Sequence, residues 1–333
     1  MAKIDILNLQ PSVISRDLRQ KYMLLYGREK CGKTTFASQA EGVLLCAFEA
    51  GTNAISGKHI ISVDTWSTFK SVVNQLKKAE AKEKYKVIAI DTVALAYTCC
   101  ESYVCNALDV TSIGDAGFGK GWTFLKKELE ETFRQITLMG YGLIFLAHSS
   151  SKTLKINAED GTEVETVYPT LPNIAKDIVN KLVDIISYIT IEYTPDGQTE
   201  TGRYINTKGN QFILAGSRYP YLAEKIPLSY KEFEKALINA IEKQEKLDGA
   251  VVIDEPIQFS QEEKRPFEEV MNEAKELWEK IRIALDSTDA LNSIVRRYFG
   301  QSFKLSQALA SQQDLVSLCI EDFQTLIEEN NIQ

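Results

Sequence analysis

Short apolar runs alternate with amphipathic stretches over the first 150 or so residues of the chain. The apolar runs cover residues 23–26, 43–48, 87–90 and 143–147. Because polar residues do not interrupt them, these runs are typical of parallel strands buried on both faces of a sheet. Apolar residues at helical spacing predict helices that begin at Thr34 and that span 66–81 and 120–138. The alternation predicts an α/β fold with a mostly parallel central sheet.

The pattern changes after residue 150. Residues 155–168 contain Asp160-Gly161, a hairpin-turn signal between two strand-like runs. The later predicted elements are antiparallel strands at 184–193 and 203–214, joined by a turn at 195–197, and a closing helix at 230–247. We therefore expect an antiparallel extension of the sheet.

A polar segment separates this domain from a helical C-terminal module. We expect one large domain over residues 1–248, a linker over 249–265 and a small all-helical module over 266–333. Apolar residues recur at helical spacing from Val270 to Leu326, which is enough for a core of two or three helices. The module is either a docking site for a partner, including another replication protein, or a structural cap.

A glycine-rich loop follows the first apolar run. Residues 27–34, Gly-Arg-Glu-Lys-Cys-Gly-Lys-Thr, fit the phosphate-loop pattern G-x-x-x-x-G-K-[ST] at every defined position. Backbone N–H groups of such a loop converge on phosphate oxygens, and the following helix adds the positive end of its dipole. The residues expected to bind ATP are Gly27, Arg28, Glu29, Lys30, Cys31, Gly32, Lys33, Thr34 and Thr35.

Three residues are expected to handle the phosphates and Mg²⁺. Lys33 reaches the β- and γ-phosphates, and the Thr34 hydroxyl ligates Mg²⁺. The run at 87–90 ends in Asp91, where a P-loop protein places the acid that holds Mg²⁺, often through water. A strand-end Asp is also a common helix N-cap or turn residue, so that alternative stays open.

Five short segments resemble phage-encoded RecA-like ATP-binding proteins, which include the Sak-type ATPases of single-strand annealing and homologous recombination. The segments are Gly27 to Thr35, Glu49 to Gly51, Ile90 to Thr92, Gly117 to Trp122 and Leu146 to Ser149. The resemblance covers about residues 20–235. It implies a RecA-like P-loop NTPase core, ATP hydrolysis coupled to single-stranded DNA, and a homo-oligomer in the form of a ring or filament.

The resemblance also implies roles for residues at strand ends and in the later strands. Glu49 polarises the attacking water, and His148 senses the γ-phosphate and passes its state to a DNA-binding loop. The alternatives without a functional role are that Glu49 is a solvent-facing acid and that His148 is a capped loop residue. Candidates for a finger that enters a neighbour's ATP site are Arg203, Lys208 and Arg218, although surface cations in a hairpin need no special role.

Two segments are candidates for contact with DNA. Residues 109–127 combine glycines, aromatics and lysines, but we expect Trp122 and Phe124 to lie in the core. Residues 150–181 carry lysines and a similar number of acids, so that their near-zero net charge weakens an electrostatic case. The candidate contact residues are Lys120, Lys126, Lys127, Lys152 and Lys155.

Composition narrows the remaining functions. The formal net charge of −8 argues against coating nucleic acid by bulk charge, but it leaves a local basic groove open. No stretch approaches the roughly 20 apolar residues of a membrane span, and no signal peptide is apparent, so we expect a cytoplasmic protein without a membrane partner. For a phage-encoded protein this is the cytoplasm of the bacterial host.

The leading hypothesis is a RecA-like ATPase that acts on single-stranded DNA in phage-type recombination or replication. A P-loop kinase for a small molecule is the first alternative, which Glu49 and the antiparallel extension disfavour. The second alternative is a nucleotide-dependent assembly protein that does not bind DNA.

Overall fold

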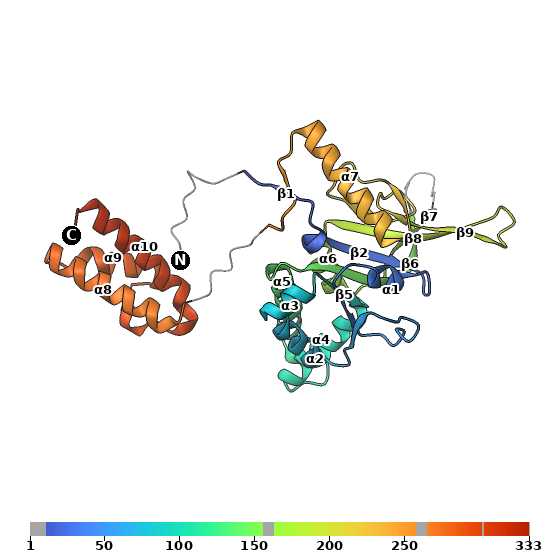
Figure 1. Ribbon diagram of the computed structural model, residues 1–333. Helices are drawn as coiled ribbons and strands as arrows, with labels where there is room; N and C mark the ends of the chain where they lie inside the picture. The colour runs from blue at the N-terminus through green and yellow to red at the C-terminus, as the bar shows by residue number, and fades with distance from the viewer. Residues whose placement is uncertain (1–10, 156–162, 258–264, 302, 333) are drawn as a thin grey trace. The chain divides into compact units, whose positions relative to one another are not determined.

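The computed structural model describes residues 11–155, 163–257, 265–301 and 303–332 (Figure 1). These residues divide into two compact units, an α/β unit within Ser12–Phe259 and a helical unit within Ser260–Gln333. Among the helices of these described ranges, none is both long and apolar enough to cross a membrane.

A ten-stranded sheet organises the α/β unit. Its strands are β2 Tyr22–Gly27, β3 Val43–Ala47, β4 His59–Ser62, β5 Val87–Asp91, β6 Gly142–Lys155, β7 Glu163–Pro169, β8 Ile185–Tyr193, β9 Glu200–Asn206, β10 Gly216–Ser217 and β11 Lys225–Pro227. The main path runs β11-β9-β8-β2-β6-β5-β3-β4, with β10 beside β8 and β7 beside β6. Neighbours from β8 to β4 are parallel, whereas β7, β9, β10 and β11 pair antiparallel.

The strand order confirms the predicted fold class. β6 separates β2, which precedes the phosphate loop, from β5, which ends in Asp91. This is the order of a RecA-like P-loop core with a mostly parallel sheet. The strands β9, β10 and β11 form the expected antiparallel extension beside that core.

Helices cover both faces of the sheet. They are α1 Lys33–Ser38, α2 Trp66–Gln75, α3 Ala79–Lys84, α4 Val93–Ala107, α5 Lys120–Leu138, α6 Asn173–Leu182 and α7 Tyr230–Asp248. Core packing places α1 and α7 on one face and α2, α4, α5 and α6 on the other, and Figure 1 shows α7 and α2 on opposite sides. Leu24 and Leu25 of β2 are fully buried in these two different cores. Because each buried Leu contributes roughly 1.5–3 kcal/mol, β2 gives the loop after it a rigid base.

Two predicted elements have different bounds in the structure. The helix predicted over 66–81 ends at Gln75, and α3 follows as a separate helix. The strand predicted over 203–214 begins at Glu200 and ends at Asn206. Within the remainder of the predicted strand the chain turns, because the side-chain oxygen of Asn210 accepts hydrogen bonds from the backbone N–H groups of Phe212 and Ile213.

The predicted hairpin after residue 150 is present. β6 continues beyond the parallel sheet, and its residues Ser149 to Lys155 pair antiparallel with β7. The expected turn, Asp160-Gly161, lies outside the described residues. A single strand therefore connects the interior of the sheet with this hairpin.

The first part of the segment predicted as a linker is bound to the α/β unit. β12, Val252–Ile253, pairs in parallel with β1, Ile14–Ser15. Arg16 donates hydrogen bonds to Glu245 at 2.6 Å and to Asp254 at 2.8 Å. β1 and Arg16 therefore hold the chain after α7 against the domain.

The helical unit has a core of its own. It consists of α8 Phe267–Leu285, α9 Asp289–Phe299 and α10 Gln313–Glu329, with short 3₁₀ turns at Leu305–Gln307 (η4) and Ala310–Gln312 (η5). Ala274, Leu291, Val316 and Phe323 are completely buried among the three helices. The predicted all-helical C-terminal module is therefore part of the observed fold.

Candidate nucleotide site

Two glycines shape the phosphate loop between β2 and α1. A Cβ atom at Gly27 would lie 2.8 Å from Cys31 Sγ and 3.2 Å from Ile189 Cβ. Gly32 has a φ of 107°, and a Cβ there would lie 2.9 Å from Leu228 Cδ2. Larger residues would therefore displace the loop at one position and strain its backbone at the other.

Lys33 is held inside the loop. The side chain is buried, and its ammonium group donates to the carbonyl oxygens of Gly27 at 3.1 Å and Arg28 at 2.8 Å. Both acceptors are neutral, and no carboxylate of the described residues forms an ion pair with this ammonium group. The ammonium is thus satisfied as a donor but remains available to oxygens that carry negative charge.

Thr34 and Asp91 meet beside this lysine. Thr34 Oγ1 donates to Asp91 Oδ2 at 2.7 Å. Burial raises the pKa of the Asp91 carboxyl, and the Thr34 hydrogen bond acts in the opposite direction. The negative charge of Glu49 raises the same pKa further. A hydroxyl and a buried carboxylate form a set of hard oxygen donors that fits Mg²⁺.

Glu49, which follows β3, is paired with His148 of β6 across the end of β5. His148 is next to Gly27 in the parallel register of β6 and β2. The backbone N–H groups of Phe48 and Glu49 both donate to the carbonyl oxygen of Asp91, at 2.7 and 3.1 Å. His148 Nε2 lies 3.1 Å from Glu49 Oε2, so an Nε2–H donates to the carboxylate. His148 Nδ1 is buried and has no hydrogen-bond partner among the described residues.

The strand ends therefore bring together the five residues with specific expected roles, Lys33, Thr34, Glu49, Asp91 and His148. Lys33 and Thr34 come from the start of α1, Glu49 follows β3, Asp91 ends β5 and His148 lies within β6. These groups fit a nucleoside triphosphate with Mg²⁺. One cation can contact phosphate oxygens, a hydroxyl and a carboxylate can bind the metal ion, and a second carboxylate lies beside them.

The three expected finger residues lie in different places. Arg203 of β9 lies beside the phosphate loop of its own chain: Nη1 donates to the Lys30 carbonyl at 3.4 Å, and Nε donates to Glu200. Lys208 forms an ion pair with Glu224. Arg218 donates to Asp184, which precedes β8 and therefore lies at the opposite end of the strands from the loop.

The aromatic residues at the start of α5 are exposed, which corrects the expectation that they lie in the core. Trp122 is 44% exposed, Phe124 50% and Phe118 fully exposed. Gly117, Phe118 and Gly119 all have positive φ, so the chain turns sharply and leaves the Phe118 ring in solvent. The Lys120 ammonium lies 5.8 Å from the centre of the Phe124 ring. We call Phe118, Lys120, Trp122 and Phe124 the α5 aromatic patch.

The other candidate DNA contacts divide between α5 and the β6–β7 hairpin. Lys126 follows Trp122 by one helical turn, and Lys127 has an ion-pair contact with Glu131 at 3.8 Å. Lys152 is exposed on the hairpin and pairs in register with Thr166, and Lys155 ends β6. The lysines on α5 are therefore those that accompany exposed aromatic rings.

One contact was missed by the sequence reasoning. Nothing in the local sequence of Arg203 indicates that it lies against the loop at Lys30, because the contact joins positions 173 residues apart. It depends on the pairing of β9 with β8 and of β8 with β2.

The fold and the loop together define a P-loop NTPase of the RecA-like type. Residues 19–219 match the AAA domain family, and the chain belongs to this family of P-loop ATPases. Along nearly its whole length it is similar to the SPbeta prophage-derived uncharacterized protein YorG of Bacillus subtilis (strain 168). The two are 30% identical over 336 residues, which cover 98% of this chain and 99% of that protein.

Two archaeal structures are more distantly similar. The flagellar accessory protein FlaH from Methanocaldococcus jannaschii is 11% identical with a TM-score of 0.34, over 62% of this chain and 84% of that chain. The KaiC-like protein PH0186 from Pyrococcus horikoshii OT3 is 13% identical with a TM-score of 0.38, over 63% and 85%. Neither likeness bears on function.

Proposed function

We propose that this protein hydrolyses ATP with Mg²⁺ and couples the hydrolysis to single-stranded DNA. The convergence of Lys33, Thr34, Asp91, Glu49 and His148 at adjoining strand ends carries the hydrolytic part of this proposal. A second carboxylate beside the Mg²⁺ acid favours hydrolysis over phosphorylation of a small molecule, because it can orient a water for attack.

Each side chain has one task in this proposal. Lys33 exchanges its loop carbonyls for β- and γ-phosphate oxygens, and Thr34 with Asp91 holds the metal ion. Bound Mg²⁺ neutralises charge that develops on the phosphates. Glu49 orients the attacking water and accepts its proton, and His148 fixes the direction of the Glu49 carboxylate.

His148 connects this site with the hairpin. It lies on β6, and the same strand continues through Ser149 to Lys155 in the pairing with β7. Because Nδ1 has no hydrogen-bond partner in the described part of the chain, the imidazole keeps one site for a polar group. A change in the Glu49–His148 pair on ATP binding therefore reaches the hairpin through a continuous strand, which is the basis of the proposed sensing role.

The α5 aromatic patch supports the DNA part. Exposed aromatic rings next to lysines are what single-strand binding requires, because bases stack on rings and ammonium groups contact phosphates. Large exposed aromatic residues are otherwise unfavourable on a soluble surface. We assign Lys120 and Lys126 to phosphate contacts, with Lys127, Lys152 and Lys155 as further candidates.

Similarity to a prophage-derived protein supports a role in phage-type DNA transactions, and the RecA-like fold is consistent with that role. We infer that the protein works in DNA recombination or replication in the cytoplasm of a bacterial host, as a homo-oligomer. Arg203 then acts within its own subunit, while Lys208 and Arg218 remain the candidates for a finger into a neighbour. The helical module serves to dock a replication or recombination protein.

The test compares ATP hydrolysis by the full chain with and without single-stranded DNA. We expect Mg²⁺-dependent phosphate release that DNA accelerates several-fold or more. If the chain hydrolyses ATP at the same rate with and without DNA and does not bind DNA, the proposed ATPase activity stands and the proposed role on DNA is wrong.

Assembly without DNA is the second candidate, because the α5 aromatic patch also suits a contact between subunits. Gel filtration with an ATP analogue distinguishes the two. If replacement of Trp122 by Ala prevents assembly and leaves DNA binding unchanged, the patch is a subunit contact.

A further inference from the structure

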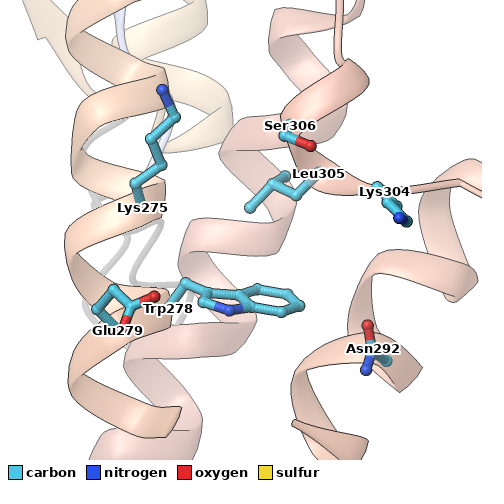
Figure 2. Close-up of a pocket in the computed structure, with 7 residues that line it drawn as sticks. All are labelled: Lys275, Trp278, Glu279, Asn292, Lys304, Leu305 and Ser306. Carbon is cyan, nitrogen blue, oxygen red and sulfur yellow. The ribbon is translucent and has the colours of Figure 1, made fainter. Parts of the chain in front are cut away.

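The helical unit contains a cavity that the ATPase does not use. It has a volume of about 470 Å³ and lies between α8, α9 and η4 (Figure 2). This volume falls within the roughly 300–1,000 Å³ of typical ligand pockets. The cavity belongs to the unit whose three helices have a core of their own, so it does not depend on the α/β unit for its shape.

An aromatic ring and a leucine form the apolar part of this cavity. Figure 2 shows the Trp278 ring extending from α8 toward Asn292 of α9, with Leu305 on the facing segment. The ring packs edge-on against the buried Phe323, with 5.9 Å between centroids and 76° between planes. Asn292 donates to Thr288 at 3.1 Å. These contacts fix the walls before any ligand arrives.

Two lysines line the same cavity. Lys275 comes from α8 and Lys304 from the residue before η4. Neither ammonium group forms an ion pair with a carboxylate of the described residues. The one acid of the lining, Glu279, pairs with Arg282 at 2.8 Å and leaves the two lysines unopposed.

The surroundings make these lysines unusual. Residues 265–332 contain seven Lys and Arg against twelve Asp and Glu. A net negative surface repels a polyanion such as nucleic acid, whereas two local cations can still pair with a few carboxylates. An apolar cavity with two free ammonium groups at its walls therefore favours a short ligand that is both acidic and apolar.

We propose that this cavity binds an acidic peptide segment of a partner protein, with one apolar side chain against Trp278 and Leu305 and carboxylates on Lys275 and Lys304. This names the chemistry of the partner for the docking role proposed above and is independent of ATP hydrolysis. The apolar contact supplies the affinity, and the two ion pairs select the acidic sequence.

The test titrates the full chain into a short fluorescein-labelled peptide in which a run of Asp and Glu ends in Phe, and follows anisotropy. We expect Lys275→Glu and Lys304→Glu each to weaken binding roughly tenfold, because each reverses one ion pair. Lys280→Glu is the matched control, since Lys280 lies on α8 but does not line the cavity, and it should bind as the unchanged chain does. Equal weakening by Lys280→Glu would overturn the proposal.

Tryptophan labelling gives a second readout that does not depend on the variants. The chain has three Trp residues, and the peptide should shift the indole signal of Trp278 while those of Trp66 and Trp122 stay in place. A peptide with Asn and Gln in place of its acids should fail to bind. The proposal is wrong if this neutral peptide binds equally well, or if an oligonucleotide displaces the acidic one. Lys33→Ala should bind the peptide normally, so a failed ATPase and a failed docking site are distinguishable.

Discussion

Among the described residues, the side-chain partner of the Glu49 carboxylate is His148. Glu49 follows β3, and His148 lies on β6 beside Gly27 of the phosphate loop. A histidine in this position can hold the carboxylate in place or release it. In the proposed mechanism, the choice between these two states decides whether hydrolysis responds to an event outside the ATP site. The pair is therefore the residue-scale feature with the most direct functional consequence.

Replacement of His148 by Ala should uncouple DNA from hydrolysis. We expect little change in ATP affinity, because Lys33 and Thr34 keep their contacts, and loss of most of the stimulation by single-stranded DNA. His148→Gln should restore part of the stimulation, since its amide can donate to Glu49. Phosphate release with and without DNA measures both, and full stimulation in His148→Ala would contradict the sensing role.

The structure brings together the residues that the sequence proposed for the centre of the site, for a physical reason. Carboxyl ends of parallel strands meet at one edge, so Glu49 after β3, Asp91 at the end of β5 and His148 where β6 leaves the parallel sheet lie near the loop after β2. The position of Arg203 could not be predicted in this way. Its contact with the loop depends on the register of an antiparallel strand that the sequence placed with the wrong bounds.

At the scale of elements, Asp184 before β8 and Arg218 after β10 form an ion pair whose contribution to stability depends on pH. Burial raises the pKa of Asp184 above its ordinary value of 3.8, and the hydrogen bond from Arg218 opposes this shift. A raised folded-state pKa means that the ionised carboxylate costs stability, and that this cost disappears as the pH falls through the folded pKa. Arg218 reduces the cost wherever Asp184 is ionised.

Arg218→Ala should therefore lower the melting temperature by a few degrees at neutral pH, and the loss should shrink as the pH falls toward the ordinary pKa of Asp184. The rate of ATP hydrolysis by the folded protein should stay unchanged if Arg218 acts only in this pair. Melting curves at several pH values test the first statement. A pH-independent loss, or a lower hydrolysis rate, would assign Arg218 another role.

The α5 aromatic patch makes a second prediction at this scale. Trp122→Ala should weaken binding of single-stranded DNA about tenfold, because stacking on an aromatic ring contributes roughly 1–3 kcal/mol per base. Tyr193→Ala is the control, since Tyr193 is 52% exposed on β8 and outside the patch. Anisotropy with a labelled oligonucleotide measures both, and equal affinities would exclude stacking on Trp122.

Elements with strong periodicity were predictable and others were not. α5 begins and ends where its apolar spacing placed it. α4 was missed because Val93–Ala107 is apolar around most of its circumference and lacks the contrast that marks a surface helix. Trp122 and Phe124 were expected in the core because large aromatics are usually buried. The face that α5 buries contains Gly121, Leu125 and Leu129 instead, and Trp122 and Phe124 lie outside it.

At the scale of the whole molecule, the phosphate-loop motif indicated a P-loop ATPase, but net charge and composition did not locate the surfaces of the protein. The charge of −8 concealed a local aromatic and basic patch on α5 and two unopposed lysines in the helical unit. Both features depend on which side chains the fold leaves exposed. The two units therefore offer separate surfaces, one proposed for DNA and one for a protein partner.

The most direct test of the account is ATP hydrolysis by the full chain and by Glu49→Gln, at equal occupancy by ATP. We expect Mg²⁺-dependent hydrolysis by the unchanged chain and a loss of about 10²-fold or more in Glu49→Gln, because a carboxamide cannot accept the proton of the attacking water. Glu49→Gln should still bind ATP, whereas Lys33→Ala should lose hydrolysis together with phosphate contacts. Hydrolysis by Glu49→Gln at the rate of the unchanged chain would contradict the account.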